Sequence, residues 1–248
     1  MPNLSELNKL GEELERILIL RTSPIAVKML EKESDVPEGS LRPKQDNGHH
    51  IAQCQAFAMS RRQKLTVAML TGDHWCFAPL IGYGFVDKPD DEELQPHVSF
   101  PRFETGKYVG IVSAPLKTAN FEPDVIIIYT NTAQLRNLLL SFSYEERMNI
   151  RYEFFPPACV YQVVPVMTEG CYVVTLPDPG DAQRALAGED EIILSVPADK
   201  FEEMLAHLKR FEEGQFGYSS TGMFMLHDFP RPEFYRKLFK RWGLDTED

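Results

Sequence analysis

Hydrophobic residues recur at helical spacing over the first twenty positions of the chain. They lie three or four residues apart, and the charged residues between them face the other way. The apolar positions are Leu4, Leu7, Leu10, Leu14, Ile17 and Leu18. The pattern predicts an amphipathic helix that ends before Thr22-Ser23-Pro24. Residues 25–30 (IAVKML) then favour a strand, and the polar residues 31–47, with two prolines and a glycine, predict a loop.

The next part of the chain predicts shorter elements. Residues 50–62 favour a helix, residues 65–70 a strand, and residues 78–84 a short helix that ends at glycine. Residues 87–93 (DKPDDEE) predict a solvated acidic loop.

Two stretches of the second half predict the same order of elements: strand, loop, strand, helix. In the first, strands at 108–112 and 124–128 precede a helix through Leu135. In the second, strands at 172–176 and 190–194 precede a helix through Phe201. We interpret this as a weak internal ββα duplication, the alternative being two ordinary units that are alike by chance. Paired strands with helices between them predict an α+β fold with a mixed or antiparallel sheet.

The end of the chain differs in composition. Residues 211–230 mix glycine, methionine and aromatic residues without a period. They predict an irregular segment that packs on the domain or closes over a cleft. Residues 232–242 predict a basic, aromatic helix. We therefore expect an α+β domain over residues 1–213 and a C-terminal aromatic extension packed on it over residues 214–248.

Composition and charge restrict the class of protein. The chain has 248 residues, with 26 Lys and Arg against 37 Asp and Glu, and a net charge of −11. This charge disfavours non-specific binding of nucleic acid, with the basic final helix as a local exception. No apolar run approaches the ~20 residues of a membrane helix, and the N-terminus lacks the apolar core of a signal peptide. We expect a cytoplasmic protein without membrane or nucleic-acid partners, and an oligomer or protein complex formed through the C-terminal aromatic segment.

Two cysteines lie close to histidines and are the first candidates for chemistry. Cys54 follows His50 in HHIAQC, and Cys76 ends HWC. If residues 50–62 are helical, His50 and Cys54 lie four residues apart on one face, a workable spacing for two ligands of one metal. Thiolate and imidazole suit zinc, iron or an iron–sulfur cluster. The alternative is that Cys54 and Cys76 are small buried apolar residues.

Cys159 and Cys171 form a second pair, twelve residues apart. Cys159 lies in an apolar, core-like segment, and Cys171 begins a predicted strand. If the two halves of the fold face each other, all four thiols can converge on one metal or iron–sulfur site. The spacing alone does not decide this.

Two turns could bind a small molecule instead. Thr130, Asn131 and Thr132 join a buried strand to a helix, where free N–H groups either receive an anion or are capped by side chains. Asp178 lies in the rigid loop LPDPGD after a strand, which suits either a ligand or a plain turn.

Several motifs resemble one known family. They are Cys54-Gln55-Ala56, the stretch from Cys76 to Gly84, and Pro123-Asp124-Val125 with the following strand, Asn131 and Gln134. Over about residues 14–208 the chain resembles DUF169, a family of uncharacterised proteins mainly of anaerobic bacteria and archaea. The resemblance strengthens Cys54 and Cys76 as functional candidates and implies no reaction. Members of the family often carry a cysteine where this chain has Asp178, which implies a lost ligand, a carboxylate in its place, or the use of Cys171.

Three functions follow as hypotheses. The first is a metal- or iron–sulfur-binding redox or accessory protein of anaerobic metabolism, with Cys54 and Cys76 as ligands and Cys159, Cys171 or His50 completing the set. The second is a module or enzyme that binds a small organic cofactor or anion in a cleft formed by the helix start at Thr130–Ala133, the loop at Asp178–Asp181 and the aromatic segment at about residues 216–224. The third is a subunit of a larger assembly, with the C-terminal segment as its interface.

Overall fold

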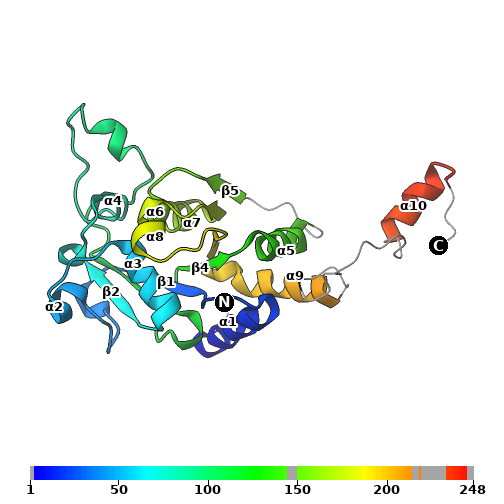
Figure 1. Ribbon diagram of the computed structural model, residues 1–248, viewed down its shortest axis with the longest axis horizontal. Helices are drawn as coiled ribbons and strands as arrows, with labels where there is room; N and C mark the ends of the chain where they lie inside the picture. The colour runs from blue at the N-terminus through cyan, green and yellow to red at the C-terminus, as the bar shows by residue number, and fades with distance from the viewer. Residues whose placement is uncertain (1–2, 144–149, 214–217, 219–232, 245–248) are drawn as a thin grey trace.

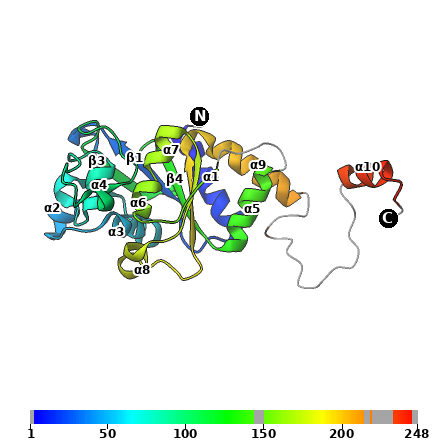
Figure 2. The ribbon, with the colours of Figure 1, turned by 90° about the horizontal axis from the view of Figure 1, so that it is seen from above.

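The computed structural model describes residues 3–143, 150–213, 218 and 233–244. The described chain forms a body built on one sheet, from which a C-terminal helix stands apart (Figures 1 and 2). Among the described residues, no helix is both long and apolar enough to cross a bilayer.

Seven strands form a mixed sheet in the order β2-β3-β1-β4-β7-β6-β5. All neighbours are antiparallel except β5 and β6, which run parallel. The strands are β1 (Ile25–Leu30), β2 (Val67–Leu70), β3 (Gly110–Pro115), β4 (Val125–Thr130), β5 (Ile150–Glu153), β6 (Tyr172–Thr175) and β7 (Ile192–Pro197). The predicted α+β class with a mixed sheet is confirmed.

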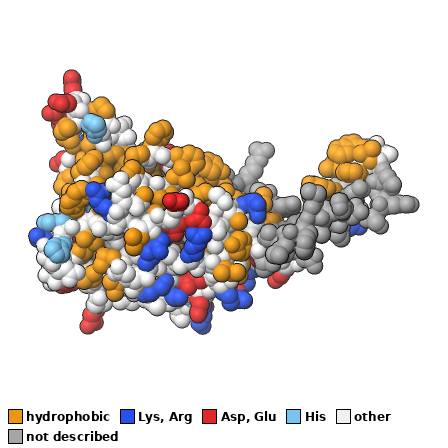
Figure 3. Space-filling view, viewed as in Figure 1, with side chains coloured by type: hydrophobic (Ala, Val, Ile, Leu, Met, Phe, Trp, Pro, Cys, Tyr) orange, Lys and Arg blue, Asp and Glu red, His pale blue; other side chains and the backbone are white. Residues whose placement is uncertain are grey.

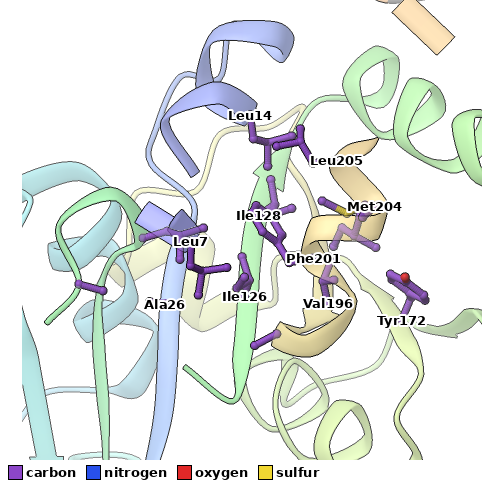
Figure 4. Packing of buried hydrophobic residues seen from close by; sticks show 14 of the residues in the cluster. Leu7, Leu14, Ala26, Ile126, Ile128, Tyr172, Val196, Phe201, Met204 and Leu205 are labelled. Atoms are coloured by element: carbon purple, nitrogen blue, oxygen red, sulfur yellow. The ribbon is translucent and has the colours of Figure 1, made fainter. Parts of the chain in front are cut away.

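Helices cover both faces of the sheet, so the central strands are apolar throughout rather than alternating. In β4, Ile126 and Ile128 face one core cluster, whereas Ile127 and Tyr129 face the other. The first cluster packs under α1 (Leu4–Leu18), α5 (Thr132–Ser143) and α9 (Phe201–Glu213), as Figure 4 shows. The second packs under α3 (Gln53–Ala58), α4 (Phe77–Gly82), α6 (Ala158–Tyr161) and α7 (Val164–Glu169), with α8 (Pro179–Arg184) against α3.

The longer predicted elements are confirmed, and shorter ones differ. The helix predicted at residues 50–62 is wrong in its first turn, because α3 begins at Gln53 and continues as a π-helical turn over Met59–Gln63. Ile51 is extended there and pairs with His74 in an isolated bridge. The predicted loop at 31–47 contains the short helix α2 (Pro43–Asn47).

The two predicted ββα units occupy the sheet differently. β3 and β4 are separated by β1, whereas β6 and β7 pair directly. The internal duplication stays a prediction.

The C-terminal extension is described only in part. Most of the predicted irregular segment at 211–230 lies outside the described residues, while the predicted final helix is α10 (Glu233–Arg241). No residue of α10 is buried.

Candidate functional site

Cys54 is the second residue of α3 and is buried against α8. The helix begins where the Gln55 side chain accepts a hydrogen bond from the Ala52 N–H at 2.9 Å. The glutamine of the Cys-Gln-Ala motif therefore fixes the turn that carries the cysteine. The Cys54 sulfur lies 3.4 Å from the point where a Cβ on Gly180 would stand. A glycine at the start of α8 thus lets that helix approach the thiol closely.

Cys76 immediately precedes α4 and lies beside the start of α3. The Ile51 N–H donates to the Asp73 carbonyl at 3.1 Å, and the Trp75 N–H donates to the Ile51 carbonyl at 2.8 Å. These bonds hold the two segments side by side, so Cys54 and Cys76 belong to one small apolar cluster. Cys76 remains partly exposed, whereas the other three cysteines are buried.

Cys159, on α6, reaches the same region from a segment about eighty residues further along the chain. Asp178 joins α6 to α8: its Oδ2 accepts from the Ala158 N–H at 2.9 Å, and its Oδ1 accepts from the Gly180 and Asp181 N–H groups at 2.7 and 3.1 Å. α6 also packs against α4. The predicted turn at Asp178 is therefore a helix cap that ties α6, and with it Cys159, to α8, which packs against the helix that carries Cys54.

The electrostatics show that these groups share one environment. Burial raises the pKa of Cys54 to about 12, and the charges of Asp181, Asp178 and Cys76 raise it further. Burial also raises the pKa of Cys159, with contributions from Asp178, Cys54, Asp181 and Cys76. Asp178, Asp181 and Cys76 thus lie close enough to Cys54 and Cys159 to oppose the ionisation of these two thiols.

A series of buried polar contacts links Asp181 to Glu191. The Tyr129 hydroxyl donates to Asp181 Oδ1 at 2.8 Å, and the Arg61 guanidinium stacks 3.8 Å from the centre of the Tyr129 ring. Arg61 in turn donates two bonds to Glu191, at 2.8 and 3.0 Å. Burial, followed by the charge of Asp178, raises the pKa of Asp181 to about 6. Asp181 belongs to the acidic loop LPDPGD that the sequence singles out, but its link to Arg61, Tyr129 and Glu191 is not predictable, because no local motif joins residues this far apart.

The other predicted metal ligands lie elsewhere or face solvent. Cys171 precedes β6, where its sulfur is 3.7 Å from the Pro165 carbonyl and 3.9 Å from Glu169 Oε2. His50 is exposed and lies outside α3, so the predicted helical spacing of His50 and Cys54 is wrong. His74 is buried instead, and burial lowers its pKa to about 4, which keeps the ring neutral at pH 7. In the part of the chain that the structure describes, both His74 ring nitrogens lack a hydrogen-bond partner.

The predicted anion site at the start of α5 is occupied by structural contacts. Asn131 Oδ1 accepts from the Gln134 N–H at 2.9 Å, and Gln134 Oε1 accepts from the Asn131 N–H at 2.8 Å. The Thr130 hydroxyl donates to the Ile192 carbonyl at 2.9 Å, and Thr132 is exposed. The capping alternative explains Asn131, whereas Thr130 ties the end of β4 to β7. Over the described ranges, no group of three or more His, Cys, Asp and Glu side chains is placed so that it could hold a metal ion.

Comparison with known proteins places the three-cysteine region within one family. Residues 13–207 match the model of DUF169, whose description is "uncharacterised ArCR". The chain belongs to the DUF169 family. It is also 20% identical over 231 residues to the uncharacterized protein MJ0308 of Methanocaldococcus jannaschii, covering 85% of this chain and 97% of that protein. No solved structure matches the chain.

The DUF169 match includes all four cysteines and both aspartates, whereas α10 lies beyond it. Neither description names an activity, so the function has to be inferred from the chemistry of the site.

Proposed function

We propose that this DUF169 protein binds a thiophilic metal ion, or an iron–sulfur cluster, through Cys54, Cys76 and Cys159 and acts as a redox or accessory protein. This proposal is supported by the packing of Cys54 and Cys76 in one small cluster, and by Cys159 lying near enough to both, and to Asp178 and Asp181, for their charges to raise its pKa. All four cysteines are free thiols, a state that a reducing, cytoplasmic setting preserves.

The charge of the site favours a cation. Two aspartates and three ionisable thiols lie together, and Arg61 stacks on Tyr129 with its own charge matched by Glu191. Burial, and after it the negative charge of the neighbouring groups, raises the pKa of Cys54 and Cys159, so these thiols ionise with difficulty in the absence of a cation. A divalent cation would offset the negative charge, lower the pKa of the thiols and so stabilise the thiolates.

The donor set favours a three-thiolate centre over a four-cysteine cluster. Cys171 contacts Glu169 and Pro165 rather than the other thiols. Both carboxylate oxygens of Asp178 already accept backbone hydrogen bonds, so this residue serves to hold α6 and α8 in place. Three thiolates leave a coordination position open for a small molecule or a partner's ligand, as in reactive rather than purely structural metal sites.

The test is the metal content of anaerobically purified protein, measured with its visible spectrum. We expect bound iron or zinc in the wild type and in Cys171→Ser, which is the matched control because it changes a buried thiol outside the centre. Cys54→Ser, Cys76→Ser and Cys159→Ser should each lose most of the metal. A wild type that is isolated without metal and binds neither added Zn²⁺ nor added Fe²⁺ would contradict the proposal. Equal loss of metal in Cys171→Ser would contradict the three-thiolate assignment.

A further inference from the structure

The C-terminal helix α10 has two chemically distinct faces. Phe234, Leu238 and Trp242 recur every four residues and form an apolar stripe, with side chains 48%, 38% and 60% exposed. At 3.6 residues per turn, Arg236 and Lys240 lie on the opposite face, whereas Lys237, which pairs with Glu233, and Arg241 flank the stripe. Because such a short helix gains little stability on its own, an apolar face in water indicates a surface that is completed by binding.

The charge of α10 is opposite to that of the rest of the protein. Four basic residues and Glu233 give the helix a net charge of +3, whereas the whole chain carries −11. The rest of the chain therefore carries a net charge of −14. Attraction between the two parts is strongest where acidic side chains gather.

The body carries an exposed apolar surface around the partly exposed Cys76. We call this surface the aromatic rim and define it by Trp75, Phe77 and Phe155, which are 61%, 53% and 77% exposed. Trp75 and Phe77 flank Cys76, and Arg184 of α8 stacks 4.5 Å from the centre of the Trp75 ring. Phe155 shortly precedes α6, which packs against α4. Trp75 and Phe77 thus lie beside Cys76, and Phe155 belongs to the segment that leads into the neighbouring helix α6.

An acidic loop follows directly after the elements that carry this rim. Residues 87–93 hold five exposed carboxylates and one lysine, a net charge of −4. Figure 3 shows acidic side chains at the tip of a projection of the body, with hydrophobic side chains gathered beside it along the side that carries α4 and β5. This surface complements α10, because its apolar side chains suit the apolar stripe and its carboxylates suit the basic residues.

We propose that α10 docks on the aromatic rim and acidic loop of a second copy of this chain. The apolar stripe would cover Trp75 and Phe77, and the basic face would lie against residues 87–93. Each copy offers one helix and one receiving surface, so an exchange between two copies satisfies both in a closed, symmetric dimer. α10 stands apart from its own body, which leaves its stripe available to a partner (Figure 2).

Sedimentation velocity over a range of protein concentrations tests this inference. We expect a concentration-dependent dimer that weakens as salt is raised, since part of the attraction is between charges. Leu238→Asp should shift the dimer dissociation constant by at least tenfold. Leu244→Asp is the matched control, because Leu244 is also 51% exposed but follows α10 and lies off the stripe. No residue of α10 is buried, so these variants should fold like the wild type.

Charge exchange identifies the receiving surface. Asp90→Lys with Glu92→Lys should weaken the dimer, Lys240→Glu with Arg241→Glu should weaken it similarly, and the four changes together should restore it. A wild type that stays monomeric at every concentration would overturn the inference, as would a dimer that all these variants leave unchanged. No cysteine is altered in these variants, so failure here leaves the proposed metal site untouched.

Discussion

Asp181 shows at the scale of one residue how burial sets the chemistry of the site. Its carboxyl is buried beside Asp178, and its pKa rises from 3.8 to about 6 even though the Tyr129 hydroxyl donates to it. The folded protein therefore holds this proton more tightly than the unfolded chain does. The contribution of Asp181 to stability is most favourable below pH 4 and declines as the pH rises toward 6.

We predict that Asp181→Asn removes this decline. The amide oxygen can still accept from Tyr129, and the variant cannot ionise. Relative to the wild type, the variant should gain roughly 3 kcal/mol of unfolding free energy between pH 4 and pH 7, the value that a shift of this size implies. Urea unfolding of both proteins across that range measures the difference. A difference that does not change with pH would contradict the assignment.

The buried ion pair of Arg61 and Glu191 makes a second prediction at this scale. Both side chains are almost fully buried, at 1% and 4% exposure, so Glu191→Gln leaves the Arg61 charge without its partner. We expect a loss of about 3 kcal/mol in unfolding free energy. Asp190→Asn is the matched control, because the neighbouring Asp190 pairs with Arg21 in an exposed ion pair. Chemical denaturation should show a lower midpoint for Glu191→Gln and an unchanged midpoint for Asp190→Asn.

Helices and strands with a clear hydrophobic period are predicted well from the sequence, whereas short elements are not. The opening helix has a clear apolar face and an Asn3 cap, and the apolar run at 124–128 corresponds closely to β4. The short helices α6, α7 and α8 were not predicted, because six residues or fewer are too short to display a helical period. They take their form from packing on the sheet and from the Asp178 bonds, which local sequence does not reveal.

The contact between α4 and α6 gives a prediction for one pair of elements. A Cβ on Gly82 would stand 2.6 and 2.7 Å from the two Val160 methyl groups, so Gly82→Ala must push the helices apart. We expect a loss of about 2 kcal/mol in unfolding free energy, a typical cost of overpacking. Val160→Ala should reduce that loss by making room. Gly72→Ala, where a Cβ would meet nothing within 4 Å, is the control. Equal effects of the two glycine substitutions on the thermal midpoint would contradict the packing argument.

The whole molecule combines a family core with a charged extension. The three core clusters draw their buried residues from Leu7 to Leu208, nearly the span of the DUF169 match. We therefore predict that a chain ending at residue 213 unfolds cooperatively, with a thermal midpoint close to that of the full chain. A truncated chain without a cooperative transition would show that the extension is part of the core.

The candidate site was predictable in its residue types and not in its arrangement. Cys54 and Cys76 follow from their motifs, but the approach of Cys159 depends on α6 packing against α4, which requires the folded sheet. The separate position of Cys171 and the exposure of His50 likewise follow from tertiary structure. The network from Asp181 to Glu191 joins four segments of the chain, so sequence spacing carries no signal for it.

Binding of one metal ion by Cys54, Cys76 and Cys159 together can be measured directly. The most direct test is a Co²⁺ titration of metal-free protein, following the thiolate-to-metal charge-transfer absorption in the wild type, Cys159→Ser and Cys171→Ser. We predict one equivalent bound by the wild type and by Cys171→Ser, more tightly as the pH rises because thiol protons must leave. We also predict a strongly reduced absorption in Cys159→Ser. Absence of the band in the wild type, or its loss in Cys171→Ser with retention in Cys159→Ser, would show that these three thiols do not form the metal site.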